Sequence, residues 1–148
     1  MAKEWGLALR LAKTDKAAIG FVLKRMAEVG DQVRATQFLA FLEGWEREAA
    51  VASLANCAWE RGDMEAFQKH MKDLEAGFSG WNSGESVYGT WFQGERQRAP
   101  IATSYGRMLA RSNDMREVWK WWSDKNGMSA NIKACVAMGI ARYLVDRR

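Results

Sequence analysis

Residues 54–67, LANCAWERGDMEAF, set the pattern for the whole chain. A large residue and a small one, Leu54 and Ala55, stand eight positions before Gly62, and Gly62-Asp63 then separates two apolar stretches with helical spacing. Glycine tolerates the left-handed conformation that ends a helix, and aspartate caps the start of the next one. The stretch therefore predicts a helical hairpin, in which Leu54 fills the gap between helices while Ala55 lets the partner backbone approach.

Similar turns recur along the chain, and the first two are a little over thirty residues apart. The turn at 29–31, VGD, lies 32 residues before the turn at 61–63, RGD, and residues 112–114, SND, have the same form. A second large–small pair, YG at 105–106, stands eight residues before Asn113, and MG at 138–139 follows 33 residues later. A period of this length is typical of hairpins that stack on one another.

The spacing of apolar residues predicts an all-α protein, since period-two alternation and β-branched runs are nearly absent. We expect a single domain over residues 1–148, in which a glycine-rich loop at 77–84 separates two sub-arrays. Asp15 is expected to cap the second helix, and Pro100 to stand in the first turn of another. About nine helices are predicted, at residues 3–13, 16–29, 32–43, 46–61, 63–76, 85–97, 100–112, 114–125 and 129–146.

At these turns and large–small pairs the sequence resembles the tetratricopeptide repeat, a helical hairpin of about 34 residues. The resemblance covers residues 16–76 and 100–146, and residues 77–99 interrupt it. It implies antiparallel hairpins stacked as a right-handed superhelix, with a concave groove that is lined by the first helix of each pair and binds a partner. A stacked helical bundle with Gly-Asp turns is the alternative.

The resemblance also implies which side chains face the groove, since the residue after each large–small pair points into it. Asn56 and Arg107 occupy that position, and Lys24 is its equivalent in the first repeat. Arg111 lies one turn beyond Arg107, and Lys133 begins the last helix near the same edge. We predict that these residues bind a carboxylate or a phosphate through charge-assisted hydrogen bonds. In the alternative interpretation, Asn56 bonds a neighbouring loop and the arginines pair with Asp114 and Glu117.

The helix at 114–125 carries a concentration of tryptophans. Met115, Val118, Trp119 and Trp122 recur at helical spacing and predict a core stripe. Trp121 lies about 100° around the helix from that stripe, and we predict that it binds a partner by stacking or as an anchor. The alternative is that Trp121 packs under a neighbouring helix or a second copy of the chain.

Charge is unevenly distributed along the chain. The formal net charge is +4, yet residues 91–148 carry 11 lysines and arginines against 5 aspartates and glutamates. A basic half can attract phosphate, an acidic peptide or an acidic subunit, and the alternative is a solvated helical surface.

The residue inventory argues against catalysis. His70 is the single histidine and lies in a polar segment, so we expect it to be exposed and to form neither a zinc site nor a catalytic pair. Phosphate-binding glycine motifs are missing, so no cofactor is expected. Cys57 and Cys135 lie in apolar helical patterns without a CxxC motif, which predicts buried, reduced thiols. Charged residues interrupt the N-terminal segment and no apolar run would span a membrane, so we expect a cytoplasmic protein.

The function that these observations favour is a non-catalytic interaction module. It would bind a protein or peptide segment, acidic or extended, in the predicted groove. The alternatives are a nucleic-acid-binding protein that uses the basic, tryptophan-rich C-terminal half, and a subunit of a larger assembly, including a homo-oligomer.

Overall fold

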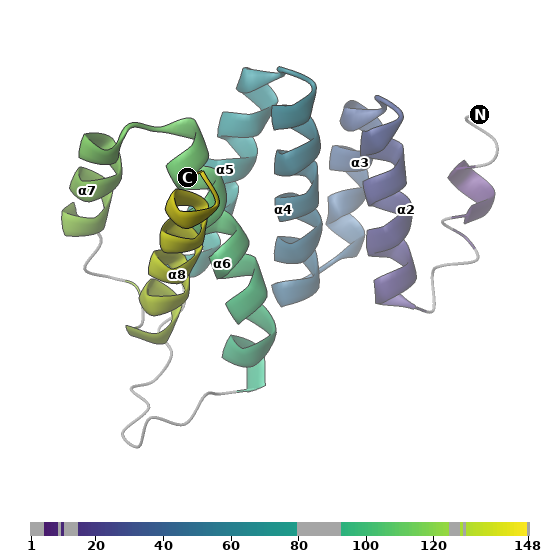
Figure 1. Cartoon of the computed structure of the whole chain (residues 1–148). Helices are drawn as coiled ribbons and strands as arrows, with labels where there is room; N and C mark the ends of the chain where they lie inside the picture. The colour runs from purple at the N-terminus through teal and green to yellow at the C-terminus, as the bar shows by residue number, and fades with distance from the viewer. Residues whose placement is uncertain are drawn as a thin grey trace. The chain divides into compact units, whose positions relative to one another are not determined.

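The computed structural model describes residues 5–8, 10, 15–79, 93–124, 128 and 130–147. Within these ranges the regular structure is helical and contains no strand, which confirms the all-α prediction. The chain forms two compact units, residues 1–73 and 74–148, whose boundary falls within helix α5. The elements shown in Figure 1 are α2 (Lys16–Glu28), α3 (Gln32–Phe38), the 3-10 helix η1 (Leu39–Phe41), α4 (Gly44–Glu60), α5 (Met64–Ser79), α6 (Gln93–Ser112), α7 (Met115–Asp124) and α8 (Ala130–Asp146).

Helix α4 lies at the centre of the first unit. Its small residues allow close packing on more than one side, and α2, α3 and η1 all pack against it. Successive helices are antiparallel, so α2 and α4 run in the same direction (Figure 1). Leu23 and Met26 of α2 and Leu54 of α4 are completely buried. On the other side, Trp59 of α4 packs edge-on against Phe67 of α5, with ring centroids 5.1 Å apart.

The turns that end α2 and α4 have the same hydrogen bonds. In the first, Gly30 N–H donates to Ala27 O (3.1 Å) and Asp31 N–H to Met26 O (2.9 Å). In the second, Gly62 N–H donates to Trp59 O (3.0 Å) and Asp63 N–H to Ala58 O (2.9 Å). Both glycines have positive φ, 99° and 75°, as this C-terminal motif requires. The two Gly-Asp turns that are alike in sequence therefore also have the same backbone structure.

The turn after α6 ends that helix by different chemistry. Asn113 does not adopt a positive φ; its side-chain amide instead donates to Leu109 O at 3.0 Å, which satisfies a carbonyl at the helix end. The SND turn is thus similar to the other two in position but not in backbone conformation.

Aspartates cap the starts of three helices, as the sequence predicts. The Oδ1 atoms of Asp15, Asp63 and Asp114 accept hydrogen bonds from the N–H groups three residues later, at 3.4, 3.1 and 2.9 Å. Asp31 differs, because its side chain makes no cap hydrogen bond and lies 3.4 Å from the Arg34 guanidinium instead.

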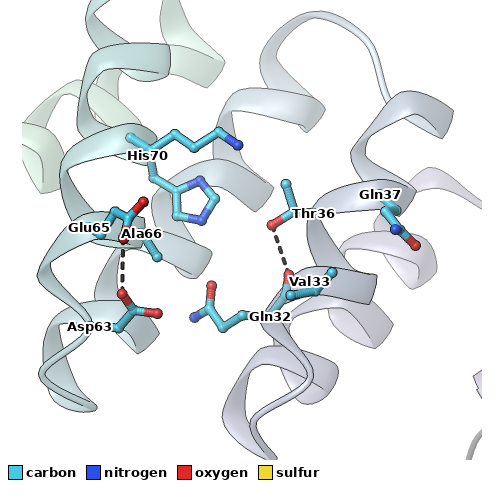
Figure 2. Close-up of a pocket in the computed structure, with 9 residues that line it drawn as sticks. Gln32, Val33, Thr36, Gln37, Asp63, Glu65, Ala66 and His70 are labelled. Carbon is cyan, nitrogen blue, oxygen red and sulfur yellow. Dashed lines mark hydrogen bonds between the residues drawn. The ribbon is translucent and has the colours of Figure 1, made fainter.

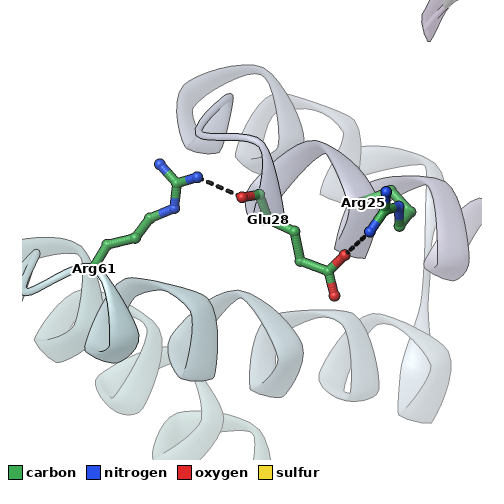
Figure 3. Close-up of polar contacts among 3 residues, drawn as sticks. All are labelled: Arg25, Glu28 and Arg61. Atoms are coloured by element: carbon green, nitrogen blue, oxygen red, sulfur yellow. Dashed lines mark hydrogen bonds and ion pairs between the residues drawn. The ribbon is translucent and has the colours of Figure 1, made fainter.

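A single side chain, that of Arg61, connects the two glycine turns (Figure 3). The Arg61 guanidinium, at the end of α4, donates to the backbone oxygen of Glu28 in the last turn of α2, while the Glu28 carboxylate pairs with Arg25. A cation at this position complements the negative end of the helix dipole. The guanidinium also lies directly against Gly30, where a Cβ atom would come within 2.6 Å of Arg61 Nη1.

The second unit is organised around the crossing of α6 and α8, which run in the same direction and pack closely along each other (Figure 1). At the crossing, a Cβ atom on Gly106 would overlap the backbone oxygen of Val136, and one on Gly139 would overlap the backbone oxygen of Thr103. The small residues at 106 and 139 therefore allow backbone-to-backbone contact, which is the role expected of the small member of each pair.

Two helix predictions need correction in the second unit. Pro100 lies in the interior of α6, as its eighth residue, so residues 93–112 form one helix rather than two. Proline lacks an N–H donor, so the helix continues through it without one of its backbone hydrogen bonds. Residues 77–79 of the predicted glycine-rich loop belong to α5, and residues 80–84, like most of the predicted helix at 85–97, lie outside the described ranges.

The predicted core stripe of α7 is also wrong in part. Val118 is buried and Trp122 is half-buried, but Met115 is exposed and 70% of the Trp119 surface is accessible. Within the described residues, the covered side of α7 is the one that carries Val118, Trp121 and Trp122.

The two cysteines are free thiols and both are buried, as predicted. Burial raises the pKa of the Cys57 thiol, which keeps it protonated and unreactive. Among the helices of the described residues, none combines the length and the apolar character that crossing a bilayer requires.

Candidate functional site

The six residues predicted to bind a partner are divided between the two units. In the first unit, Lys24 is exposed on α2, and Asn56 is half-buried on α4 and has an interaction partner. The other four, Arg107, Arg111, Trp121 and Lys133, belong to the second unit.

Most of the basic residues predicted in the second unit already have partners within it. The Arg107 guanidinium lies 2.9 Å from the Asp146 carboxylate, and the Lys133 ammonium lies 4.6 Å from the centre of the Trp122 ring. Arg111 is half-buried and has a partner, although its Nε atom is buried without a hydrogen bond. Arg107 therefore pairs with Asp146, and not with Asp114 or Glu117 as the alternative interpretation expected. A ligand carboxylate at Arg107 would compete with Asp146.

Trp121 is half-buried in a cluster of side chains of the second unit. Its indole N–H donates to Glu75 Oε2 at 3.2 Å, and its ring lies 5.7 Å from the ring of Tyr105. The Tyr105 hydroxyl donates to the same oxygen at 3.2 Å, and the buried ring of Tyr105 contacts Phe78 edge-on. Burial together with the Glu75 charge raises the pKa of Tyr105, so its hydroxyl remains a donor. These contacts correspond to the alternative interpretation, in which Trp121 packs within the protein and does not bind a partner.

A pocket that the sequence did not indicate lies in the first unit, between α3 and the start of α5 (Figure 2). Its volume is about 390 Å³, which is enough for one large side chain or a small ligand. Helix α3 is short, and the residues that face across the gap include the small Thr36 and Ala66, so the two helices do not close on each other. The lining residues are Gln32, Val33, Thr36 and Gln37 from α3, and Asp63, Glu65, Ala66, Lys69 and His70 from the start of α5.

His70 is buried in the wall of this pocket, contrary to the prediction that it is exposed. Only 3% of its surface is accessible, and its imidazole makes no hydrogen bond to any described residue. Burial lowers its pKa more than the neighbouring Asp73 and Asp63 carboxylates raise it, and Lys69 and Arg47 lower it further. The ring is therefore neutral at pH 7, with one nitrogen as a donor and one as an acceptor.

Gln32 faces His70 across the pocket (Figure 2). Its amide nitrogen donates to Leu54 O of α4 at 3.3 Å, which fixes the side chain with its oxygen turned toward the pocket. That oxygen is buried and has no hydrogen-bond donor. A buried acceptor without a donor costs on the order of 1–3 kcal/mol, which a ligand with a donor group would recover.

The charged residues of the lining are two carboxylates, Asp63 and Glu65, and one amine, Lys69. One oxygen of the Asp63 carboxylate accepts the capping hydrogen bond of α5. The Thr36 hydroxyl donates its proton to the backbone oxygen of Gln32, so the lone pairs of the hydroxyl oxygen remain available as acceptors. Behind the pocket, Arg47 of α4 forms two hydrogen bonds to Asp73, at 2.9 and 2.8 Å, and these hold α4 and α5 together. The pocket therefore offers mainly acceptors and a net negative charge. The described residues contain no cluster of three metal-binding side chains.

The sequence contained a signal for His70 but none for Gln32. His70 stands three residues after Phe67 and four before Leu74, which are both buried, so the apolar spacing of α5 places the imidazole on the core side. The polar neighbours Gln68 and Lys69 obscured that spacing. Gln32 is a polar residue at the start of a helix, a position where most such side chains are exposed.

Comparisons of the chain with protein-family models, with curated proteins and with solved structures find no match. The class of the molecule is thus defined by its fold alone, as an all-α protein.

Proposed function

We propose that the chain is a helical-repeat interaction module, of the tetratricopeptide type, that binds a segment of a partner protein. The observation that carries the proposal is the pocket between α3 and α5, where Gln32 Oε1 is buried without a hydrogen-bond donor and His70 is enclosed in the wall. Native structures rarely leave such an acceptor unsatisfied, so its position on an open pocket favours a ligand.

Support for a repeat comes from the identical glycine turns at Gly30 and Gly62 and from α2 and α4 packing in the same direction. Repeat proteins present extended surfaces on which polypeptide segments bind. Val33, at the pocket, leaves 74% of its surface accessible and would give such a segment an apolar contact. The predicted groove residues Lys24 and Asn56 belong to α2 and α4, so they would form a second contact surface of the same unit.

The test is selection of peptides from a random phage-displayed library on the immobilised full-length chain, followed by anisotropy titration of the enriched peptides. We expect one-to-one binding with dissociation constants on the order of 10 μM. Val33→Asp should weaken binding, while Val145→Asp is the matched control, since Val145 is an equally exposed valine of α8. Failure to enrich any peptide that binds saturably, or equal losses in both variants, would overturn the proposal.

A second candidate function, nucleic-acid binding, is favoured by Trp119. This exposed indole lies on α7 next to Lys120 and three residues from Arg116, and exposed aromatics beside cations stack on unpaired bases. Titration of a labelled single-stranded oligonucleotide at low salt should then show binding that weakens steeply as salt rises. Trp119→Ala should abolish it and Trp45→Ala, an exposed tryptophan of the first unit, should not. Binding that ignores Trp119 excludes this function for α7.

A further inference from the structure

We propose that the pocket between α3 and α5 binds an arginine side chain of the partner segment, with the guanidinium donating to Gln32 Oε1 and to the carboxylates of Asp63 and Glu65. This inference rests on the proposed function, and it names the ligand chemistry of the same site. It departs from the expectation of an acidic partner, which followed from the predicted groove residues and not from this pocket.

Hydrogen bonding at Gln32 determines which groups a ligand must carry. Gln32 Oε1 is buried and lacks a donor, and its own amide nitrogen is already used by Leu54 O. The ligand must therefore supply an N–H or O–H group at this point. A carboxylate or phosphate has none to offer when ionised, so an anion would leave Gln32 unsatisfied.

The net charge of the pocket lining favours a cation. Asp63 and Glu65 outnumber the one cation of the lining, Lys69, whose long side chain is exposed and free to turn into solvent. The planar guanidinium carries five N–H donors, so one group reaches a buried amide oxygen and a carboxylate together, which a compact ammonium does less well. The charge-assisted bonds are about twice as strong as neutral ones.

The state of His70 also permits a cation in the pocket. The buried ring is neutral at pH 7, so it does not repel a cation. The charged groups around the ring are Asp63, Lys69 and Asp73 on its own side, and Arg47 from α4. The described part of α3 opposite contributes only neutral side chains to the lining.

The experiment uses His70 as a reporter, because the chain has one histidine and so gives one imidazole signal in NMR spectra. The full chain is titrated at pH 7 with four blocked amino acids: N-acetyl-arginine amide, N-acetyl-lysine amide, the uncharged arginine isostere N-acetyl-citrulline amide, and anionic N-acetyl-glutamate amide. We expect arginine amide to shift the signal saturably with a dissociation constant on the order of 1 mM, and citrulline and glutamate to bind at least several-fold more weakly. Lysine should be intermediate.

Substitutions of pocket residues test whether arginine binds in the pocket. Gln32→Leu should weaken arginine binding about tenfold, because it removes the buried acceptor. Since Gln32 also bonds α4, Glu65→Gln is the gentler variant, with an expected loss of about threefold for a solvent-exposed ion pair. Glu60→Gln is its matched control, an exposed carboxylate of the same unit that does not line the pocket.

Equal binding of citrulline and arginine, tighter binding of glutamate, or no saturable shift would each overturn the arginine assignment. These results are distinguishable from failure of the proposed function. Enriched peptides that bind without a basic residue refute the arginine pocket but keep the interaction module. Saturable arginine binding without any enriched peptide keeps the pocket and refutes the module.

Discussion

His70 shows how burial changes the behaviour of a single side chain. A histidine on the surface adds little to stability, whereas one enclosed as the neutral form makes folding dependent on pH. The imidazole lies between α3 and α5, and desolvation is the largest cause of its lowered pKa. The same residue therefore connects the stability of the first unit to the chemistry of the pocket.

The first prediction is a loss of stability when the solution is made mildly acidic. In the unfolded chain the pKa of His70 has its ordinary value of 6.5, and in the folded chain it is lower. Above pH 6.5 both states are neutral and the full stability is present. Below it the unfolded state binds the proton first, so the free energy of unfolding falls until the folded pKa is passed. Thermal melts of the wild type and of His70→Gln, from pH 7 downward, check this.

The His70→Gln variant should lack the decrease just below pH 6.5, in the range where few carboxylates titrate. If the two proteins lose stability in parallel there, His70 is not the group responsible.

At the scale of helices and turns, local chemistry in the sequence predicted most of the architecture. Aspartates at turns, glycines at helix ends and apolar spacing defined the positions of α2, α4, α5, α7 and α8 to within a few residues. These signals act over one or two turns of chain, so a single sequence shows them.

The failures at this scale have tertiary causes. Pro100 indicated a helix start, but α6 continues through it and packs along α8. Met115 and Trp119 have helical spacing, yet they lie on an exposed side of α7. The pocket could not be predicted, because it depends on two helices that are distant in sequence and fail to close.

The second prediction concerns the crossing of α6 and α8. Gly106→Ala should destabilise the protein by about 2–3 kcal/mol, because the new methyl group meets the backbone of Val136, which cannot move aside as a side chain would. Gly20→Ala is the control. Gly20 lies inside α2 with no atom near its Cβ position, so alanine there should stabilise by about 0.5–1 kcal/mol. Urea unfolding of both variants measures the difference, and a tolerated Gly106→Ala would contradict the close contact.

The third prediction separates aspartates that cap a helix from one that does not. Asp114→Ala removes the 2.9 Å hydrogen bond to Glu117 N–H and should cost about 1 kcal/mol. Asp31→Ala removes only an exposed contact with Arg34 and should cost about 0.3 kcal/mol. The same unfolding curves decide the matter, and a larger effect at Asp31 would show that its turn relies on the carboxylate after all.

At the scale of the whole molecule, the sequence predicts one domain in which a glycine-rich loop at 77–84 separates two sub-arrays, and the compact units of the structure divide after Asp73, inside α5. The six predicted binding residues fall in both units, and the residue pattern by itself does not state which side chains already have partners, as Arg107 does with Asp146.

The fourth prediction uses the two buried thiols as reporters of the two units. Cys57 belongs to the first unit and Cys135 to the second, and both are free. Gly106→Ala should accelerate alkylation of Cys135 by iodoacetamide about thirtyfold for a local loss of about 2 kcal/mol, with little change at Cys57. Peptide mass spectrometry after timed quenching gives both rates. Equal acceleration at the two cysteines would mean that the units open together.

The close contact of α6 and α8 at Gly106 and at Gly139 has a further consequence for how the molecule tolerates its surroundings. Close approach of two neutral backbones gains its energy from the fit of their surfaces, which dissolved salt and protons do not weaken as they weaken charge pairs. The backbone contacts between α6 and α8 should therefore persist at high salt and in weak acid, whereas the ion pairs of Arg107 with Asp146 and of Arg47 with Asp73, and the enclosure of the neutral imidazole, should respond to these conditions.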